Sequence, residues 1–111
     1  MGNSCRSQMA EAIARKMGYN ACSAGTNPSQ KVNAKALKVL ESKNYSTDGL
    51  YPKSIDDVDW KSYNKIISMG CGVSCPAIKI DIDWKLDDPV SQPIRVFEEI
   101  ALIIEQKIKE L

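Results

Sequence analysis

Thiols, one guanidinium and two neighbouring carboxylates are the groups in this chain best able to do chemistry. The cysteines are Cys5, Cys22, Cys71 and Cys75, and the 111 residues include no histidine. Without imidazole, the chain lacks the usual general base and the usual partner of a serine or cysteine nucleophile. Any reaction must therefore use thiols, carboxylates, Arg or Lys side chains, or backbone amides. In an intracellular chain, such cysteines indicate catalysis or metal binding before a structural disulfide framework.

The stretch GNSCRS, at 2–7, opens the chain and leads into a segment of strong helix formers. A tetrahedral oxyanion such as phosphate or arsenate binds where backbone N–H groups converge at a helix N-terminus beside a bidentate cation. Here the small residues tolerate left-handed backbone, the serines offer hydroxyls, and Arg6 offers a planar fork. The stretch therefore indicates an anion site or, more simply, a capped helix start. The candidate anion-binding residues are Gly2, Asn3, Ser4, Cys5, Arg6 and Ser7.

A second pair of thiols, Cys71 and Cys75, follows an apolar run. Gly72 makes a turn between them easier, so the two thiols could form a disulfide. They could also form half of a zinc site, which would need two further ligands when only Cys5 and Cys22 remain. Two inert buried cysteines are the third interpretation. Cys22 itself lies in a predicted strand and is expected to pack in the core.

Two adjacent carboxylates, Asp87 and Asp88, precede Pro89. Expelling hydroxide or alkoxide from arsenic or phosphorus is easier when a carboxylic acid protonates the leaving oxygen. Proline restricts the residue before it to extended geometry, so Asp88 stands in a stiff segment. On the residues alone, however, a turn with solvated acids before the last helix is the favoured interpretation.

Alternating helices and strands must position these groups. Periodic apolar residues predict helices over 7–17, 29–44 and 94–111. Short apolar runs predict strands over 19–26, 64–70 and 78–84. A short helix is expected after Ser54, while Ser7 is expected to cap the first long helix and Gly18 to end it. The apolar face expected on the last helix comprises Val96, Phe97, Ile100, Leu102, Ile103, Ile104 and Ile108.

The alternation predicts an α/β fold, with a doubly wound, mostly parallel sheet flanked by helices in one domain over 1–111. Such a sheet usually has its first strand near the centre, yet this sequence opens on a helix. A first central strand is therefore expected to be missing from the 111 residues.

Composition describes an ordinary globular domain, with 43% hydrophobic and 26% charged residues and a net charge of +1. This charge gives no broad basic surface for nucleic acid or acidic membranes. The apolar runs are too short to span a bilayer, and no signal-peptide pattern is present. The expected compartment is the cytoplasm.

Three motifs, GNSCRSQMAEA, SAGT and LDDP, make the chain resemble the low-molecular-weight protein tyrosine phosphatase superfamily over essentially its whole length. The resemblance is closer to the thioredoxin-coupled arsenate reductases built on that fold. In that family the loop reads Cys-x-Gly-Asn-Ser-Cys-Arg-Ser, and its first Cys is the nucleophile. Aligned on this sequence, that Cys falls one position before Met1. The resemblance therefore implies that the start of this sequence is placed too late and that an apolar strand ending in Cys precedes Met1. It also implies that the 111 residues alone have no activity.

The resemblance also implies roles for the other groups. The nucleophilic thiol attacks arsenate, Cys71 attacks the resulting arseno-cysteine and releases arsenite, and Cys75 closes a disulfide with Cys71. Thioredoxin then reduces this disulfide. Arg6 binds the anion, and Asp88 is the general acid, with Asp87 in reserve.

Other positions match the family less directly. Cys5 lies in the family inside the loop and behind the anion, so it is not expected to be the nucleophile. Asn3, Glu11 and Ser23 match residues that in some relatives steady the loop or help to hold a potassium ion. Ser54 stands where those relatives have Asp, which counts against the ion. No other metal and no bound cofactor are expected.

Two other functions compete with arsenate reduction. The same loop could hydrolyse phosphomonoesters with the nucleophile, Arg6 and Asp88 alone. Phosphatases of this fold usually carry aromatic residues soon after the Asp-Pro, whereas Pro89 is followed here by Val-Ser-Gln. This difference favours a small inorganic oxyanion over phosphotyrosine. The third function is anion binding without catalysis. The expected partners are thus a small oxyanion and thioredoxin.

Overall fold

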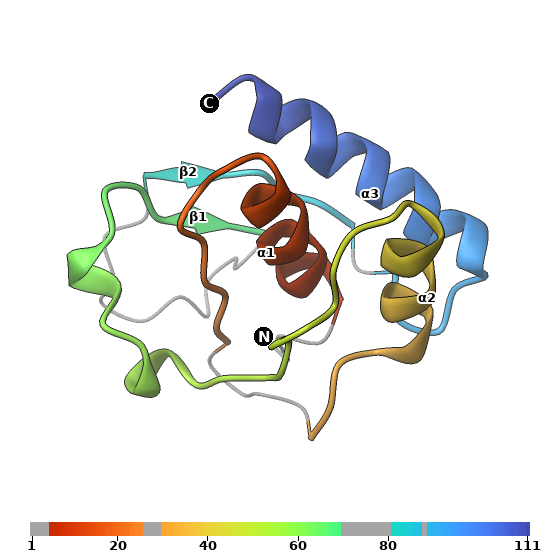
Figure 1. Ribbon diagram of the computed structural model, residues 1–111, viewed down its shortest axis with the longest axis horizontal. Helices are drawn as coiled ribbons and strands as arrows, with labels where there is room; N and C mark the ends of the chain where they lie inside the picture. Colours follow the sequence, from red (N-terminus) through yellow and green to blue (C-terminus); the bar gives the residue numbers. More distant parts are fainter. Residues whose placement is uncertain (1–4, 26–29, 70–80, 88) are drawn as a thin grey trace.

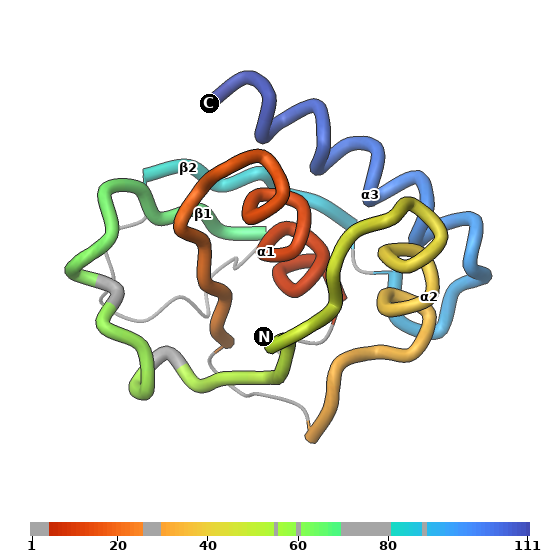
Figure 2. The backbone as a smooth tube through the Cα atoms, viewed as in Figure 1, coloured from red at the N-terminus to blue at the C-terminus, as the bar shows by residue number. Residues whose placement is uncertain are grey.

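The computed structural model describes residues 5–25, 30–69, 81–87 and 89–111, and the structural statements below refer to this part of the chain. Figure 2 traces the backbone from red at the N-terminus to blue at the C-terminus. The long helices are α1 (Arg6–Lys16), α2 (Ala34–Ser42) and α3 (Ile94–Lys109). Two short 3₁₀ helices are η1 (Ile55–Asp57) and η2 (Trp60–Ser62). The strands are β1 (Ile67–Ser68) and β2 (Ile82–Asp83).

The three long helices pack against one another and form most of the apolar core (Figure 1). Met9 and Ile13 from α1, Leu40 from α2, and Phe97 and Ile104 from α3 are all fully buried. Burying one such side chain contributes about 1.5–3 kcal/mol. The core therefore fixes the start of α1, where the predicted anion-binding residues lie, relative to the other helices.

The three predicted helices are confirmed, as is the short helix after Ser54. The second long helix begins later than predicted, at Ala34. Asn33 caps it, because its side-chain Oδ1 accepts the N–H of Lys35 at 2.9 Å. This cap sets the first helical residue, which hydrophobic periodicity alone does not fix.

The expectation that Ser7 caps the first helix is wrong. The helix starts one residue earlier, at Arg6, with Cys5 as the N-cap and no side-chain cap hydrogen bond. The carbonyl of Cys5 already accepts the N–H of Met9 at 2.9 Å. Ser7 therefore lies within the first turn instead of before it.

α1 ends as expected at Gly18, which has a φ of 96°. The N–H of Gly18 donates to the carbonyl of Arg15 at 3.1 Å, and the N–H of Tyr19 donates to that of Ala14 at 3.0 Å. These two bonds form a Schellman motif, which requires a left-handed residue. Asn44, with a φ of 65°, has the same place after α2.

α3 buries a narrower face than predicted. Its buried residues are Phe97, Ile100, Ala101, Ile104 and Ile108. Leu102 and Ile103 are 53% and 42% exposed, so their assignment to the core face is wrong. The buried positions follow a single stripe of the 3.6-residue helical period, and these two residues lie outside it. No helix in the described part of the chain is long and apolar enough to cross a bilayer.

The sheet is smaller than predicted. β1 and β2 run parallel, with Ile67 paired to Ile82. A separate parallel bridge joins Gly25 to Ser54. Among the described residues of the predicted strand 19–26, this bridge is the only strand pairing. The parallel direction is confirmed, but over the described residues the strands are shorter than predicted. Extended backbone forms a regular strand only where a neighbour pairs with its N–H and C=O groups, and each described strand has one such neighbour.

Candidate functional site

Arg6, the first residue of α1, reaches the carboxyl ends of both strands. Its Nη1 donates to the carbonyl of Met69 at 2.8 Å and to that of Leu86 at 2.6 Å. The Met69 carbonyl also accepts the N–H of Leu86 at 3.0 Å, so one guanidinium nitrogen closes the end of the parallel pair. Arg6 is only 9% exposed. Shielded, charge-assisted hydrogen bonds of this kind contribute about 1.5–3 kcal/mol each.

The remainder of the Arg6 guanidinium makes no hydrogen bond to the described residues. Nη1 uses both of its N–H donors, while the Nε and Nη2 donors have no acceptor among the described residues. Nε and Nη2 together form the fork that binds two oxygens of a carboxylate or phosphate. Open parallel sheets bind their ligands at the carboxyl ends of the strands, which is where this fork lies.

The structure places only some of the predicted site residues. Those outside the described residues are Gly2, Asn3, Ser4, Cys71, Cys75 and Asp88. Cys5 is 4% exposed and belongs to the core. Ser7 is half-buried in the first turn of α1. Of the predicted anion-binding and catalytic residues, Arg6 is the one whose described contacts reach both strands.

Asp88 lies outside the described residues, and the described residues on either side of it differ in burial. Leu86 and Pro89 are buried, whereas Asp87 is exposed. Lys85 has a left-handed φ of 50°, and its N–H donates to Asp83 Oδ1 at 3.0 Å. This turn directs Leu86 into the core. The Leu86 carbonyl accepts Arg6 Nη1, so Leu86 lies at the same edge of the sheet as Arg6.

A buried carboxylate, Glu11, joins α1 to two other segments. Its side chain is 0% exposed, and its Oε1 accepts both the N–H and the hydroxyl of Ser23 at 2.7 Å. Lys53 Nζ lies 3.3 Å from Oε1, and Arg15 Nη2 lies 2.8 Å from Oε2. Oε2 has no other polar partner in the described part of the chain. Arg15 and Lys53 together compensate the buried negative charge.

The described residues among those expected to help hold potassium, Glu11 and Ser23, do not fit that ion. Glu11 Oε1 already accepts both Ser23 donors and lies beside the Lys53 ammonium. Ser54 Oγ accepts the N–H of Asp56 at 3.2 Å. A metal cation bound to Glu11 would thus compete with the ammonium for the same oxygen. Within the described ranges, no cluster of three or more Cys, Asp or Glu residues could hold a metal ion.

Sequence reasoning missed two buried polar residues at this place. Gln8, which is 0% exposed, donates Nε2 to the carbonyl of Tyr51 at 2.8 Å. Lys53 Nζ donates to the same carbonyl at 3.0 Å. A polar residue within the apolar stripe of α1 is the signal that could have found Gln8. Nothing in the sequence around Lys53 marks it as buried.

Cys22 is half-buried and lies outside the apolar core, so the expectation that it packs in the core is wrong. It lies beside Tyr63. The pKa of Tyr63 is raised, and burial is the largest cause. The hydrogen bond and charge of Cys22 and the charge of Glu11 raise this pKa further, while the charge of Arg15 lowers it. The tyrosine therefore stays protonated at neutral pH.

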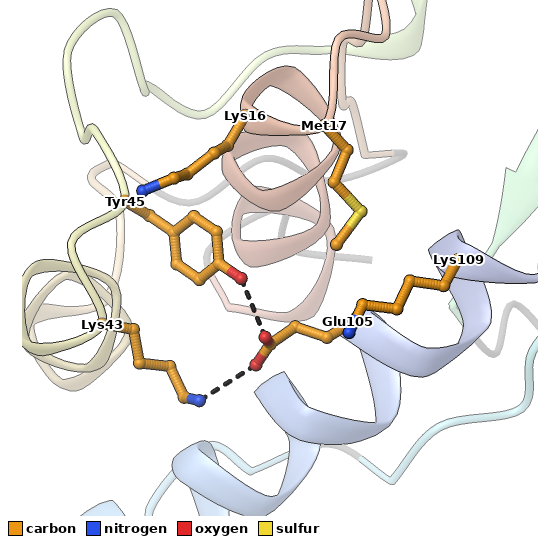
Figure 3. A pocket seen from close by; sticks show the side chains of 6 residues that line it. All are labelled: Lys16, Met17, Lys43, Tyr45, Glu105 and Lys109. Atoms are coloured by element: carbon orange, nitrogen blue, oxygen red, sulfur yellow. Dashed lines mark hydrogen bonds and ion pairs between the residues drawn. The ribbon is translucent and has the colours of Figure 1, made fainter.

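A cavity of about 250 Å³ lies where the C-terminal ends of α1 and α2 meet α3 (Figure 3). Its lining residues are Lys16, Met17, Lys43, Tyr45, Glu105 and Lys109. Lys43 Nζ lies 2.9 Å from Glu105 Oε1, and the Tyr45 hydroxyl donates to Oε2 at 2.9 Å. Lys16 Nζ donates to the carbonyl of Asn44 at 3.0 Å. Lys16 binds the carbonyl that follows α2, and Lys43 binds the Glu105 carboxylate. These side chains therefore stabilise the contacts between the helices around the cavity.

The ionisation of the Tyr45–Glu105 pair follows from these contacts. Burial raises the pKa of Glu105, but the hydrogen bonds from Lys43 and Tyr45 outweigh it and hold the pKa below its ordinary value. Burial and the Glu105 hydrogen bond raise the pKa of Tyr45 to about 12. The pair is therefore a charged carboxylate and a neutral phenol over a wide pH range.

Comparison with known proteins places this chain in a family. The profile of the low molecular weight phosphotyrosine protein phosphatases matches the chain over residues 1–111. The chain belongs to this family. The resemblance inferred from the motifs is confirmed, and the α/β fold is that of the low molecular weight phosphatases.

Several members of the family that resemble the chain are arsenate reductases. The glutaredoxin arsenate reductase of Synechocystis sp. is 31% identical over 116 residues, covering 98% of this chain and 88% of the relative. The arsenate reductase of Staphylococcus aureus strain Newman is 32% identical over 116 residues, covering 94% and 88%. A solved arsenate reductase in the phosphate binding state has a TM-score of 0.88 at 31% identity, covering 98% and 88%. The thioredoxin-dependent arsenate reductase of Corynebacterium glutamicum has a TM-score of 0.76 at 28% identity, covering 99% and 57%.

Proposed function

We propose that the protein reduces arsenate to arsenite by a relay of cysteines that ends in a Cys71–Cys75 disulfide, which thioredoxin reduces. Arsenate reductases at 31% and 32% identity over nearly the whole chain support the substrate. One structural observation carries the proposal. Arg6 Nη1 donates to the carbonyls of Met69 and Leu86, while Nε and Nη2 have no acceptor among the described residues and are proposed to bind the oxyanion.

The sequence places the proposed reacting groups close to this arginine. Cys71 follows Met69 by two residues, and Asp88 follows Leu86 by two residues. Because two residues of chain span about 7 Å at most, covalent geometry limits how far either group can lie from the carbonyls that Arg6 holds. The relay thiol and the acid are thus expected at the edge of the sheet where the anion binds.

The proposed reaction transfers two electrons from thiols to arsenic. A cysteine thiolate at the family's nucleophile position displaces hydroxide from arsenate and forms an S–As bond. The thiolate of Cys71 attacks that sulfur, an S–S bond forms, and the electron pair of the broken S–As bond reduces As(V) to As(III), which leaves as arsenite. The thiolate of Cys75 then attacks Cys71, forms their disulfide and releases the first thiolate. A thioredoxin dithiol reduces the Cys71–Cys75 disulfide and is itself oxidised.

Asp88 is proposed to protonate the oxygen that leaves arsenic in the first step, with Asp87 in reserve. Protonation matters because hydroxide is a poor leaving group at neutral pH. Arg6 and the backbone amides of the anion-binding residues compensate the charge of the bound oxyanion and lower the pKa of a thiol beside it. Because every step needs reduced thiols, we place the protein in the cytoplasm.

Phosphomonoester hydrolysis is the second candidate function, and the match to a phosphatase family profile favours it. It needs the nucleophile, Arg6 and Asp88 but neither relay thiol. The variants Cys71→Ser and Cys75→Ser therefore separate the two functions. In a polypeptide that carries the nucleophilic Cys, each variant should lose multiple-turnover arsenate reduction and keep hydrolysis of p-nitrophenyl phosphate. Cys22→Ser is the matched control and should keep both.

Arsenate reduction at the control rate by both relay variants would contradict the relay. The reductant is tested in the same assay, because the Synechocystis relative is a glutaredoxin arsenate reductase. Turnover with glutaredoxin and none with thioredoxin would contradict the proposed partner. We further expect a polypeptide of the 111 residues alone to bind phosphate without turnover, since no cysteine stands at the nucleophile position. Arsenate turnover by that polypeptide would contradict this expectation.

A further inference from the structure

The group formed by Glu11, Ser23, Arg15 and Lys53, in which only the Arg15 side chain is exposed, has more positive than negative charge. Glu11 is the one carboxylate in it, and its side chain is 0% exposed. Arg15 and Lys53 are both ion-paired to this carboxylate, and the side chain of Lys53 is only 7% exposed. A buried lysine is rare unless it is paired, because desolvating an ammonium is costly. Its position therefore needs an explanation.

The contacts of the Lys53 ammonium are those that suit a monovalent metal cation. Nζ lies 3.3 Å from Glu11 Oε1 and 3.0 Å from the carbonyl oxygen of Tyr51. It also lies 4.3 Å from the centroid of the Tyr51 ring. A carboxylate oxygen, a backbone carbonyl and the face of an aromatic ring all attract a cation of low charge. The ammonium thus contacts groups that would also attract a potassium ion.

We infer that the ammonium of Lys53 is a built-in cation that takes the place of a bound potassium ion, so that the fold does not depend on potassium. A metal ion added to Glu11 would place a third positive charge around one buried carboxylate. It would also have to displace the ammonium from Glu11 and Tyr51 before it could reach their oxygens. This inference uses only described residues and does not depend on the proposed arsenate reductase activity.

Because the Lys53 ammonium is covalently part of the chain, it links two segments of the fold. The backbone carbonyl of Lys53 accepts the N–H of Gly25 at 2.8 Å, next to the parallel bridge between Gly25 and Ser54. Its side chain reaches Glu11 on α1. One residue therefore joins α1 and the segment ending at Gly25, whereas a potassium ion would leave that connection dependent on salt.

Thermal unfolding in potassium chloride and in choline chloride at equal ionic strength tests the inference. The wild-type chain should have the same Tm in both salts. Lys53→Met should lower the Tm in choline by on the order of 10 °C, because Glu11 loses its one buried cation and keeps only the exposed Arg15. Potassium at about ten times its dissociation constant should then raise the Tm of this variant by roughly 5 °C. Lys38→Met, at an exposed position on α2, is the matched control and should change little in either salt.

Three results would overturn the inference. A wild-type Tm that rises with potassium relative to choline would show that an ion binds although Lys53 is present. A Lys53→Met variant that loses no more stability than Lys38→Met would show that the ammonium is not needed. A Lys53→Met variant with equal Tm values in both salts would show that potassium cannot replace it. If Lys53→Met does not fold in either salt, Lys53→Arg keeps the charge, and a potassium-dependent Tm in that variant would also overturn the inference.

Discussion

Arg6 and Leu86 are 80 residues apart in the sequence, yet the guanidinium Nη1 of the first lies 2.6 Å from the carbonyl oxygen of the second. The same nitrogen donates to Met69, so one side chain fixes the ends of both strands against the start of α1. The group proposed to bind the substrate therefore also maintains the geometry of its own site. A substitution there should affect stability and anion binding together.

Replacing Arg6 with lysine separates charge from shape. Lys keeps the positive charge but has no planar fork. We expect Arg6→Lys to weaken phosphate binding about 10- to 100-fold and to lower the free energy of unfolding by about 1–3 kcal/mol. Titration calorimetry and urea unfolding measure the two effects. Arg95→Lys, at an exposed position on α3, is the control, and equal phosphate affinities in the two variants would contradict the assigned role.

The Tyr45–Glu105 pair should make stability depend on pH at both extremes. The folded pKa of Glu105 is lowered, so its contribution is present above the unfolded pKa and is lost as the pH falls through the folded pKa. The folded pKa of Tyr45 is raised to about 12, so its contribution is present below the unfolded pKa and is lost as the pH rises towards 12.

Glu105→Gln tests the acid side of this dependence. Urea unfolding at a series of acidic pH values should give a shallower loss of stability for Glu105→Gln than for the wild type. The difference at neutral pH should be about 1 kcal/mol or less, because the ion pair is partly exposed. Glu98→Gln, at an exposed position on the same helix, should follow the wild-type curve. Parallel curves for Glu105→Gln and the wild type would contradict the assignment.

Gly18→Ala tests the left-handed end of α1. A Cβ at Gly18 would meet no atom within 4 Å, so the cost arises from the φ of 96° alone. We expect a loss of about 1 kcal/mol, or a Tm lower by about 5 °C. Gly18→Asn should lose less, since asparagine tolerates this conformation better. A larger loss for Asn than for Ala would show that the conformation is not the cause.

Two adjacent isoleucines on α3 give a matched test of the core. Ile104 is 0% exposed and Ile103 is 42% exposed. Ile104→Ala should cost about 2–5 kcal/mol of unfolding free energy, because a cavity forms in the core. Ile103→Ala should cost about 0.5 kcal/mol or less. Equal costs by urea unfolding would contradict the placement of Ile103 outside the core.

The sequence predicts the long helices well and the strands poorly. Helical periodicity is a property of neighbouring residues, and the stripe with Phe97 and Ile104 is visible without any partner. Strand pairing depends on segments far along the chain, so the shortness of β1 and the lone bridge at Gly25 could not be foreseen. Helix starts also failed where a cap decides them, as at Asn33, because periodicity does not identify the first residue.

The candidate site likewise has residues that the sequence predicts and contacts that it does not. Arg6 is recognisable because its loop motif is local and specific. Its acceptors at Met69 and Leu86 are 63 and 80 residues away, so the sequence alone could not indicate that its Nη1 holds both strands. The pairing of Lys53 with Glu11 was missed for the same reason, since a lone lysine in a mixed segment is usually exposed.

The parallel pairing of β1 with β2 has a consequence for how such enzymes diversify. Antiparallel neighbours can be joined by a tight hairpin whose length is tied to the register. Parallel neighbours need a connection that travels back along the whole pair, and its length is not set by the register. The interval between the two thiols can therefore lengthen or shorten over evolution while Ile67 stays opposite Ile82.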